Sequence, residues 1–469
     1  MRGGAHPDSQ SGAGRQPRTL WRVSPENAST ESDLGPPRPA ERDCDVLVIG
    51  GGPSGSAAAY WLASRGLDVV VVEKKHFPRQ KTCGDGLTPR SVRQLADMGL
   101  EPDLSARHHR YEGLRSMAFG RTLEMKWPSG PDYPDYGYTV TRYDLDGLVA
   151  ANAEKAGAEL WQGAEAIGPL AGDDDTDPSG LRRAGGARIL ATARTTVSEV
   201  RARYTIVADG SLTRFGRALG TARVKTWPQG MALRGYYSSP RHDDTYIESH
   251  LDIKDRDGNA VPGYGWIFPL GDGRVNVGVG LLSTSDRWKG VNTTKLMEHF
   301  VSFAPKSWCI GPGTALGDPT GGRLPMGLSV GPRVGADWVI VGDAAGSINP
   351  FNGEGIAYGY ETGRIAAEIV AGAAGADDPS RLADYEARLE AEYGRYYAVA
   401  RSFVRLIEDP KLLRACVGAG MYVTPVMEWM LRIMANLIRP ELAGPPEAIY
   451  RSAAALSRYV ERRRLRAVG

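Results

Sequence analysis

The strongest constraint on the fold is a glycine-rich turn between an apolar strand and a helix. Residues 44–49 read as a buried strand, residues 50–55 as GGGPSG, and an alanine-rich helical stretch follows at once. Gly50 allows a tight turn, Gly52 lets the backbone approach a pyrophosphate, and Gly55 lets the helix pack closely on the strand. The helix N-terminus would face the phosphates. The pattern predicts a dinucleotide-binding α/β domain.

The residues that follow complete this motif. A second apolar strand, residues 68–72, leads to Glu73, whose carboxylate can accept a hydrogen bond from a ribose hydroxyl. Ser54 in the turn and Lys74 beside the acid are further candidate contacts. Glycine supplies 59 of the 469 residues, well above the roughly 7% of average usage, so we expect many close backbone approaches.

A distant second motif indicates which dinucleotide binds. Residues 342–346 read GDAAG after a strand at 338–341, and residues 349–355 read NPFNGEG before a helical run. This resembles the second flavin motif of the p-hydroxybenzoate-hydroxylase-type flavoproteins, and two other segments resemble further motifs of that fold. The resemblance implies an FAD cofactor contacted by Arg142, Asp209, Gly210, Asp343, Gly353, Gly355 and Ile356. The helix N-terminus would stabilise negative charge on the reduced flavin.

Two more segments resemble the geranylgeranyl reductase family. Residues 77–87 match its FPRxKxCGxG stretch, which implies that Cys83, Gly84, Asp85 and Gly86 lie beside the flavin. Residues 262–269, PGYGWIFP, resemble its PxxYxWxFP signature, although Val261 stands where the first proline belongs. In that family this strand faces the substrate, so Tyr264, Trp266, Phe268 and Pro269 become candidate substrate contacts.

The aromatic spacing has a physical meaning of its own. Residues two apart in a strand point to one face, so Tyr264, Trp266 and Phe268 predict a continuous apolar wall suited to an isoprenoid chain. An ordinary core strand is the alternative. We expect the faces of Tyr264 and Trp266 to stabilise positive charge that develops as an unpolarised double bond is reduced. Cys83 is the candidate proton donor or redox group near the flavin.

The resemblance implies an FAD-dependent reductase that saturates an isolated C=C bond in a prenyl chain. Longer matching stretches, such as residues 83–90 and 275–280, point to the actinobacterial branch of the family that acts on one isoprene unit of the lipid quinone menaquinone. Two alternatives stay open. The geranylgeranyl chain of a diphosphate, chlorophyll or glycerolipid could be the substrate, or the chain could be a flavin monooxygenase or halogenase acting on an aromatic compound.

Charge and composition restrict the possible partners and the cellular location of the protein. The net charge of +2 gives no general reason to bind nucleic acid, and four scattered cysteines suggest neither disulfides nor a metal site. Residues 391–469 carry 13 Lys and Arg against 7 Asp and Glu, a surplus of 6. A basic, partly apolar helical end predicts contact with a membrane surface. We therefore expect a cytoplasmic protein, peripheral on the inner face of the cell membrane, that takes electrons from NAD(P)H or another reduced carrier.

The expected fold class is α/β, a Rossmann-type FAD-binding domain with an inserted, mostly antiparallel β-sheet substrate domain and a helical C-terminal region. Residues 1–42 are predicted to be a disordered extension. The predicted boundaries are 43–111, 139–224 and 336–385 for the FAD-binding domain, 112–138 and 225–335 for the sheet domain, and 386–469 for the helical region.

Overall fold

Strands β1 and β2 and helix α1, which carry the first motif, form as the sequence predicts. The computed structural model describes residues 38–172, 174–191, 196–282, 291–407, 409–438 and 444–468, so most of the predicted N-terminal extension, 1–37, lies outside the described residues. The described residues from Arg38 onward form one compact unit. The exact domain boundaries given above stay a prediction.

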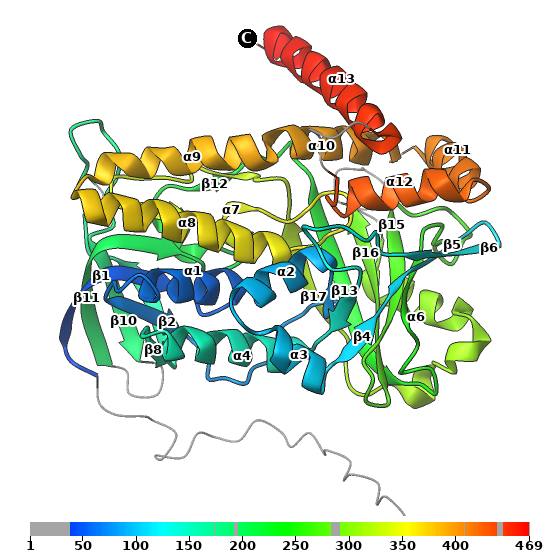
Figure 1. Cartoon of the computed structure of the whole chain (residues 1–469), viewed down its shortest axis with the longest axis horizontal. Helices are drawn as coiled ribbons and strands as arrows, with labels where there is room; N and C mark the ends of the chain where they lie inside the picture. Colours follow the sequence, from blue (N-terminus) through cyan, green and yellow to red (C-terminus); the bar gives the residue numbers. More distant parts are fainter. Residues whose placement is uncertain are drawn as a thin grey trace, which may run out of the picture. The chain divides into compact units, whose positions relative to one another are not determined.

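The first sheet has seven strands and carries the dinucleotide motif (Figure 1). Its order is β8 (Glu159–Gln162), β2 (Val69–Glu73), β1 (Glu41–Ile49), β11 (Thr196–Val207), β10 (Gly186–Ala191) and β9 (Ala164–Pro169), with β19 (Trp338–Ile340) also on β11. β1 runs parallel to β2 and β11, and β19 is parallel to β11. Strands β2 and β19 are buried throughout, and β1 and β11 are buried over their last four residues, as expected where parallel strands are covered on both faces.

Helix α1 (Pro53–Ala63) packs between α4 (Arg142–Lys155) and α8 (Ile356–Ala376). Small residues make the close packing possible. A Cβ on Gly55 would lie 1.8 Å from the Gly50 carbonyl oxygen, and one on Gly363 of α8 would lie 2.4 Å from the Ser54 carbonyl oxygen. The first motif is therefore locked against the helix that follows the second motif.

The second sheet confirms the predicted antiparallel architecture. Its seven strands run in the order β17 (Thr320–Pro325), β13 (Gln229–Ser238), β16 (Arg274–Leu282), β15 (Gly263–Pro269), β14 (Tyr246–His250), β5 (Gly113–Ala118) and β6 (Arg121–Lys126). All neighbours pair antiparallel except β14 and β5. One face packs its Val and Ile side chains against α6 (Thr293–Phe303). The opposite face carries the aromatic triad.

A small sheet connects these two parts. It consists of β3 (Gly86–Leu87), β7 (Gly137–Thr139) and β4 (His109–Tyr111), and α2 (Pro89–Asp97) and α3 (Glu101–Arg107) lie beside it. The short elements α5 (Arg214–Ala218), β12 (Ala222–Arg223), β18 (Val330–Gly331) and α7 (Gly342–Ala345) complete the connections. The junction brings residues from both sheets to one place.

The C-terminal region is helical, as predicted. It contains α9 (Ala383–Leu389), α10 (Arg395–Ile407), α11 (Pro410–Gly420), α12 (Thr424–Met434) and α13 (Pro445–Val468). Helices α11 and α12 share an apolar cluster with β5, β6 and β14, in which Ile247, Met421 and Met427 are buried. In the described ranges, no helix is both long and apolar enough to cross a bilayer.

Candidate active site

The glycine turn has the geometry that dinucleotide binding requires. Gly50 has a φ of +103°, and a Cβ there would meet the Ala208 carbonyl oxygen at 2.4 Å, so no side chain fits. At Gly52 the nearest atom to such a Cβ is Arg79 Nη2, at 3.8 Å. The backbone of Gly52 thus borders open space in front of the N-terminus of α1.

Glu73 holds this turn in place. Its Oε2 accepts hydrogen bonds from the Gly51 N–H at 3.1 Å and from Arg79 at 3.2 Å. Arg79 continues to Asp146 at 2.8 Å, and Arg142 donates to the same carboxylate, with Nη2 at 2.8 Å from Oδ2. The buried guanidinium of Arg142, predicted to reach the cofactor, is therefore anchored to Asp146. Lys74 is exposed.

The second motif packs against the glycine turn of the first. The side chain of Ser54 packs on Gly342, where a Cβ would lie 1.9 Å from its Oγ. Asp343 is half-buried, and burial raises the pKa of its carboxyl against the opposing effect of Lys81 and Arg142. Gly353 (φ +76°) and Gly355 precede Ile356, the first residue of α8.

These residues fit an FAD cofactor. Asp209 binds the Phe215 N–H through Oδ2 at 2.8 Å, while its buried Oδ1 has no hydrogen-bond partner in the described part of the chain. A Cβ on Gly210 would meet nothing within 4 Å. Unpaired carboxylate oxygens and open glycine backbone are what a ligand rich in hydroxyl and phosphate groups would use. Asp209, Gly210, Asp343 and the 50–55 turn would hold it.

The aromatic triad forms one continuous wall. The ring centroids of Tyr264 and Trp266 are 5.8 Å apart, and those of Trp266 and Phe268 are 6.2 Å apart. The Tyr264 hydroxyl donates to the Asn352 carbonyl oxygen at 2.6 Å, and burial raises the pKa of Tyr264 to about 12. The Trp266 N–H donates to Asn276 Oδ1 at 2.9 Å. Both polar tips are bound internally, Trp266 is buried, and the half-buried rings of Tyr264 and Phe268 are the groups left for a ligand.

The turn that contains Cys83 lies on this wall. A Cβ on Gly86 would meet the Phe268 ring at 3.1 Å, so the backbone approaches that ring closely. Asp85 is buried with a φ of +62°, and its Oδ2 accepts from Tyr236 at 2.6 Å and from Asn276 at 2.8 Å. Burial raises the pKa of both the Asp85 carboxyl and the Cys83 thiol. The predicted catalytic residues Cys83, Tyr264 and Trp266 are thus brought together.

Pro269 ends the wall strand rather than lining its centre. It is buried at the end of β15, and its carbonyl oxygen accepts from the Thr139 hydroxyl at 2.6 Å. The contact joins the wall to the small sheet that carries Gly86.

The sequence interpretation missed two polar residues beside the aromatic wall, Asn276 and Glu354. Asn276 is fully buried in β16 and connects Trp266, the Cys83 carbonyl oxygen and Asp85. A single amide in the apolar strand Val275-Asn276-Val277 could have been noticed, because a buried amide needs partners. Glu354 lies between two predicted cofactor glycines, and its charge was overlooked.

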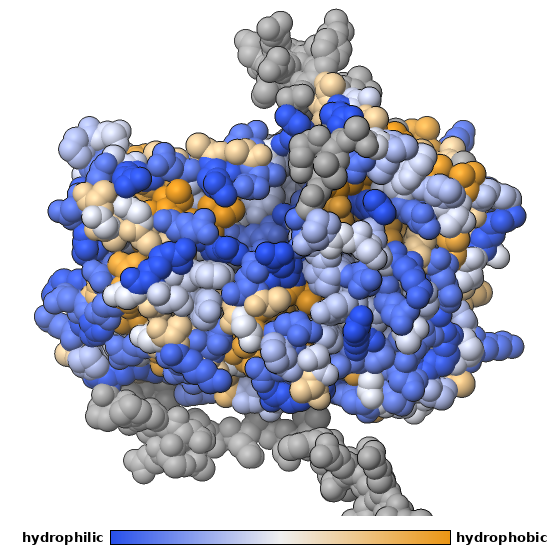
Figure 2. All heavy atoms as spheres, in the orientation of Figure 1, coloured by the Kyte–Doolittle hydropathy of each residue, from blue (hydrophilic) through white to orange (hydrophobic). Residues whose placement is uncertain are grey.

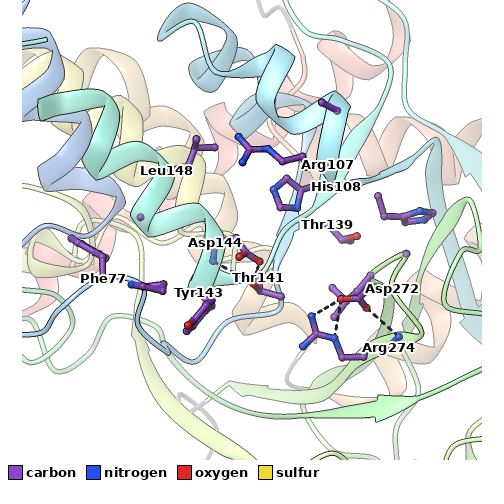
Figure 3. Close-up of a pocket in the computed structure, with 16 residues that line it drawn as sticks. Phe77, Arg107, His108, Thr139, Thr141, Tyr143, Asp144, Leu148, Asp272 and Arg274 are labelled. Carbon is purple, nitrogen blue, oxygen red and sulfur yellow. Dashed lines mark hydrogen bonds and ion pairs between the residues drawn. The ribbon is translucent and has the colours of Figure 1, made fainter. Parts of the chain in front are cut away.

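A pocket of about 880 Å³ opens between α3, α4 and the β15–β16 turn (Figure 3). Phe77, Tyr143 and Leu148 supply apolar surface, and Arg107 and Arg274 supply charge. Arg274 pairs with Asp272, as the dashed lines show. The pocket borders the glycine turn, because the Phe77 ring would be 3.3 Å from a Cβ on Gly51. The residues predicted to bind the cofactor or the substrate do not line this pocket.

Comparisons with known proteins support an FAD-dependent oxidoreductase. Residues 43–232 match the model of an FAD binding domain. A menaquinone reductase of Mycobacterium tuberculosis is 39% identical over 89% of this chain and 97% of its own length. A digeranylgeranylglycerophospholipid reductase of Methanothermobacter thermautotrophicus is 29% identical over 79% of this chain and 89% of its own length.

Solved structures give the same result. A geranylgeranyl bacteriochlorophyll reductase-like protein of Thermoplasma acidophilum superposes with a TM-score of 0.67 at 26% identity, covering 80% of this chain and 90% of that one. Flavin-dependent halogenases are also similar, but below 25% identity they share the fold alone. The chain therefore belongs to the geranylgeranyl reductase family of FAD-dependent oxidoreductases.

Proposed function

We propose that the protein is an FAD-dependent reductase that saturates one isolated C=C bond in the prenyl tail of menaquinone. The observation that carries this proposal is the 39% identity to a menaquinone reductase over 97% of that protein's length. The continuous aromatic wall beside the residues that fit FAD supports a prenyl substrate. A long apolar chain needs such an extended ring surface, whereas a small aromatic compound does not.

The aromatic wall and the turn that contains Cys83 have separate roles in the proposed reaction. Reduced FAD, when bound, supplies a hydride for the double bond. As a proton adds to one carbon of the double bond, positive charge develops on the other carbon, which accepts the hydride, and the faces of Tyr264 and Trp266 stabilise this charge. Asn276 fixes the tilt of Trp266 through the 2.9 Å hydrogen bond. Phe268 and the end of β15 at Pro269 extend the apolar surface along the chain.

Cys83 is one candidate for the proton that completes the reaction. Burial raises the pKa of its thiol, so the group keeps its proton at neutral pH. Asn276 Nδ2 donates to its carbonyl oxygen at 2.9 Å, which fixes the turn against the wall. A neutral thiol suits proton donation better than nucleophilic or metal chemistry, for which the thiolate is needed.

A membrane surface and an electron donor are the remaining partners in this proposal. Tyr422 and Val423, in the turn between α11 and α12, are 70% and 48% exposed. Apolar atoms gather over α11 and α12 at the upper right of Figure 2. We propose peripheral contact with the inner face of the cell membrane here. The electrons come from NAD(P)H or another reduced carrier.

The geranylgeranyl chain of another lipid is the second candidate substrate. The digeranylgeranylglycerophospholipid reductase named above favours it, since it belongs to the same family at 29% identity. Because the wall would accept either chain, the head group must distinguish the two lipids.

Mass spectrometry of the lipids tests the proposal. In a strain that lacks this protein, the menaquinone tail should contain one more double bond and therefore two fewer hydrogens, and the intact gene should restore the form with one saturated unit. The gene with Tyr264→Ala is the matched control and should restore little. An unchanged quinone pool together with a more unsaturated glycerolipid would instead favour the second substrate.

A further inference from the structure

A half-buried glutamate, whose carboxyl group has one buried oxygen without a partner among the described residues, lies at the end of the aromatic wall. Glu354 lies in the loop before α8, and its Oε1 accepts hydrogen bonds from the hydroxyls of Thr88 and Ser91, the latter at 3.2 Å. Its Oε2 is buried and has no hydrogen-bond partner among the residues that the structure describes. A buried carboxyl oxygen without a partner is costly unless a ligand or a proton occupies it.

The loop brings this oxygen close to the place where a prenyl chain would bind. The Tyr264 hydroxyl donates to the carbonyl oxygen of Asn352, two residues before Glu354, at 2.6 Å. A Cβ on Gly353 would lie 3.6 Å from the same hydroxyl. The phenols of Tyr264 and Tyr111 both interact electrostatically with Glu354, and Tyr111 belongs to the apolar cluster beneath α11 and α12.

We propose that Glu354 is the acid that protonates the prenyl double bond. The inference rests on the proposed function and assigns the step that the aromatic wall cannot perform. The hydride brings both electrons to one carbon, and the O–H bond at Oε2 breaks as the C–H bond forms at the other. Glu354 is left as a carboxylate, which takes up a proton from solvent after the product leaves.

The surroundings of Glu354 suit this cycle. Burial raises the pKa of its carboxyl to about 7, although the hydrogen bond from Thr88 and the charge of Arg90 lower it. An acid with a pKa near the working pH can both give up and recover a proton. The charged and titratable groups that face it are Arg90, Glu361, Tyr111, Tyr133, Tyr264 and Tyr358. Arg90 is the cation that stabilises the carboxylate left behind.

Glu354→Gln tests the assignment, because glutamine keeps the shape and cannot donate a carboxylic proton. We expect the variant to bind FAD in full and to accept electrons at the wild-type rate, while prenyl reduction falls ~10²- to 10⁴-fold. Glu354→Asp should recover part of the activity, and Glu368→Gln, an exposed glutamate of α8, should change nothing. A fall of less than tenfold in E354Q with normal FAD content would overturn the proposal, as would a large loss in Cys83→Ser alone.

A second measurement needs no substrate. Since the pKa of Glu354 lies near 7 in the folded protein against an ordinary 4.5, the bound proton stabilises the fold at low pH, and this is lost as pH rises through 7. The melting temperature of wild type minus that of E354Q should therefore decrease as the pH rises from 4.5 to about 7, and it should stay constant above pH 7. A difference that is independent of pH would overturn the assignment. If the difference falls as expected but no prenyl lipid is reduced, the proposed function fails and the titration of Glu354 stands.

Discussion

At the scale of single residues, the hydroxyl and the ring of Tyr264 have separate tasks. The hydroxyl positions the loop of Asn352 through a 2.6 Å bond, and the ring forms one end of the wall. Tyr264→Phe removes a hydrogen bond worth about 1 kcal/mol and keeps the ring, so we expect slightly lower stability and turnover within about tenfold of wild type. Tyr264→Ala removes the ring and should lower turnover by roughly 100-fold.

Steady-state turnover, with FAD content and melting temperature measured in parallel, separates these effects. If Phe were as damaging as Ala in turnover while both bound FAD, the hydroxyl rather than the ring face would be the essential group. The pair therefore tests the cation-stabilising wall independently of the proton donor.

The sequence indicated glycines and aromatic residues better than it indicated their polar partners. Gly50 and Tyr264 belong to motifs that can be recognised from the spacing of their residues along the chain. The roles of Asn276 and Glu354 depend on contacts between elements that are far apart in the sequence. Asn276 binds Cys83 and Asp85 from nearly two hundred positions away. Arg142 shows the same limit, because Asp146, one helical turn along α4, engages its guanidinium.

At the scale of elements, the wall depends on a glycine in the neighbouring strand. Gly278 of β16 pairs with Trp266, and a Cβ there would lie 2.2 Å from Cζ2 of the indole and 2.6 Å from the Leu233 carbonyl oxygen. Gly278→Ala must displace the ring or the sheet, at a cost of ~1–3 kcal/mol. We expect a lower melting temperature, altered tryptophan fluorescence and a loss of turnover. Gly130→Ala, with nothing within 4 Å, is the control, and equal behaviour of the two variants would contradict this packing.

The elements themselves were largely predictable. Buried Val and Ile runs gave β1, β2 and β19 to within two or three residues at either end, and the aromatic-rich segment 225–335 forms most of the antiparallel sheet. The joining sheet β3-β7-β4 was not predicted. Its strands have two or three residues each, too few for a periodic signal, and they form because tertiary contacts such as Thr139 to Pro269 hold them.

At the scale of the whole molecule, the proposed membrane contact assigns a role to the α11–α12 turn. Behind the exposed Tyr422 and Val423 lies the apolar cluster of α11, α12 and β14, and the phenol of Tyr111 in that cluster interacts electrostatically with Glu354. We propose that a prenyl tail enters from the membrane along this apolar cluster. The basic residues predicted to assist, 462–466, have side chains outside the described residues.

Replacing both turn residues, Tyr422→Ser with Val423→Ser, should release the protein from vesicles that contain anionic lipid. Each large apolar side chain that enters the interface contributes roughly 1.5–3 kcal/mol when fully buried, so losing two should weaken binding at least tenfold. Co-sedimentation with vesicles measures this directly. Phe303→Ser is the matched control, because Phe303 is 75% exposed on α6, a helix outside this cluster. If Phe303→Ser weakened vesicle binding as much as the double variant, or if neither weakened it, the membrane contact would lie on another surface. The proposed entry of the prenyl tail at α11 and α12 would then be wrong.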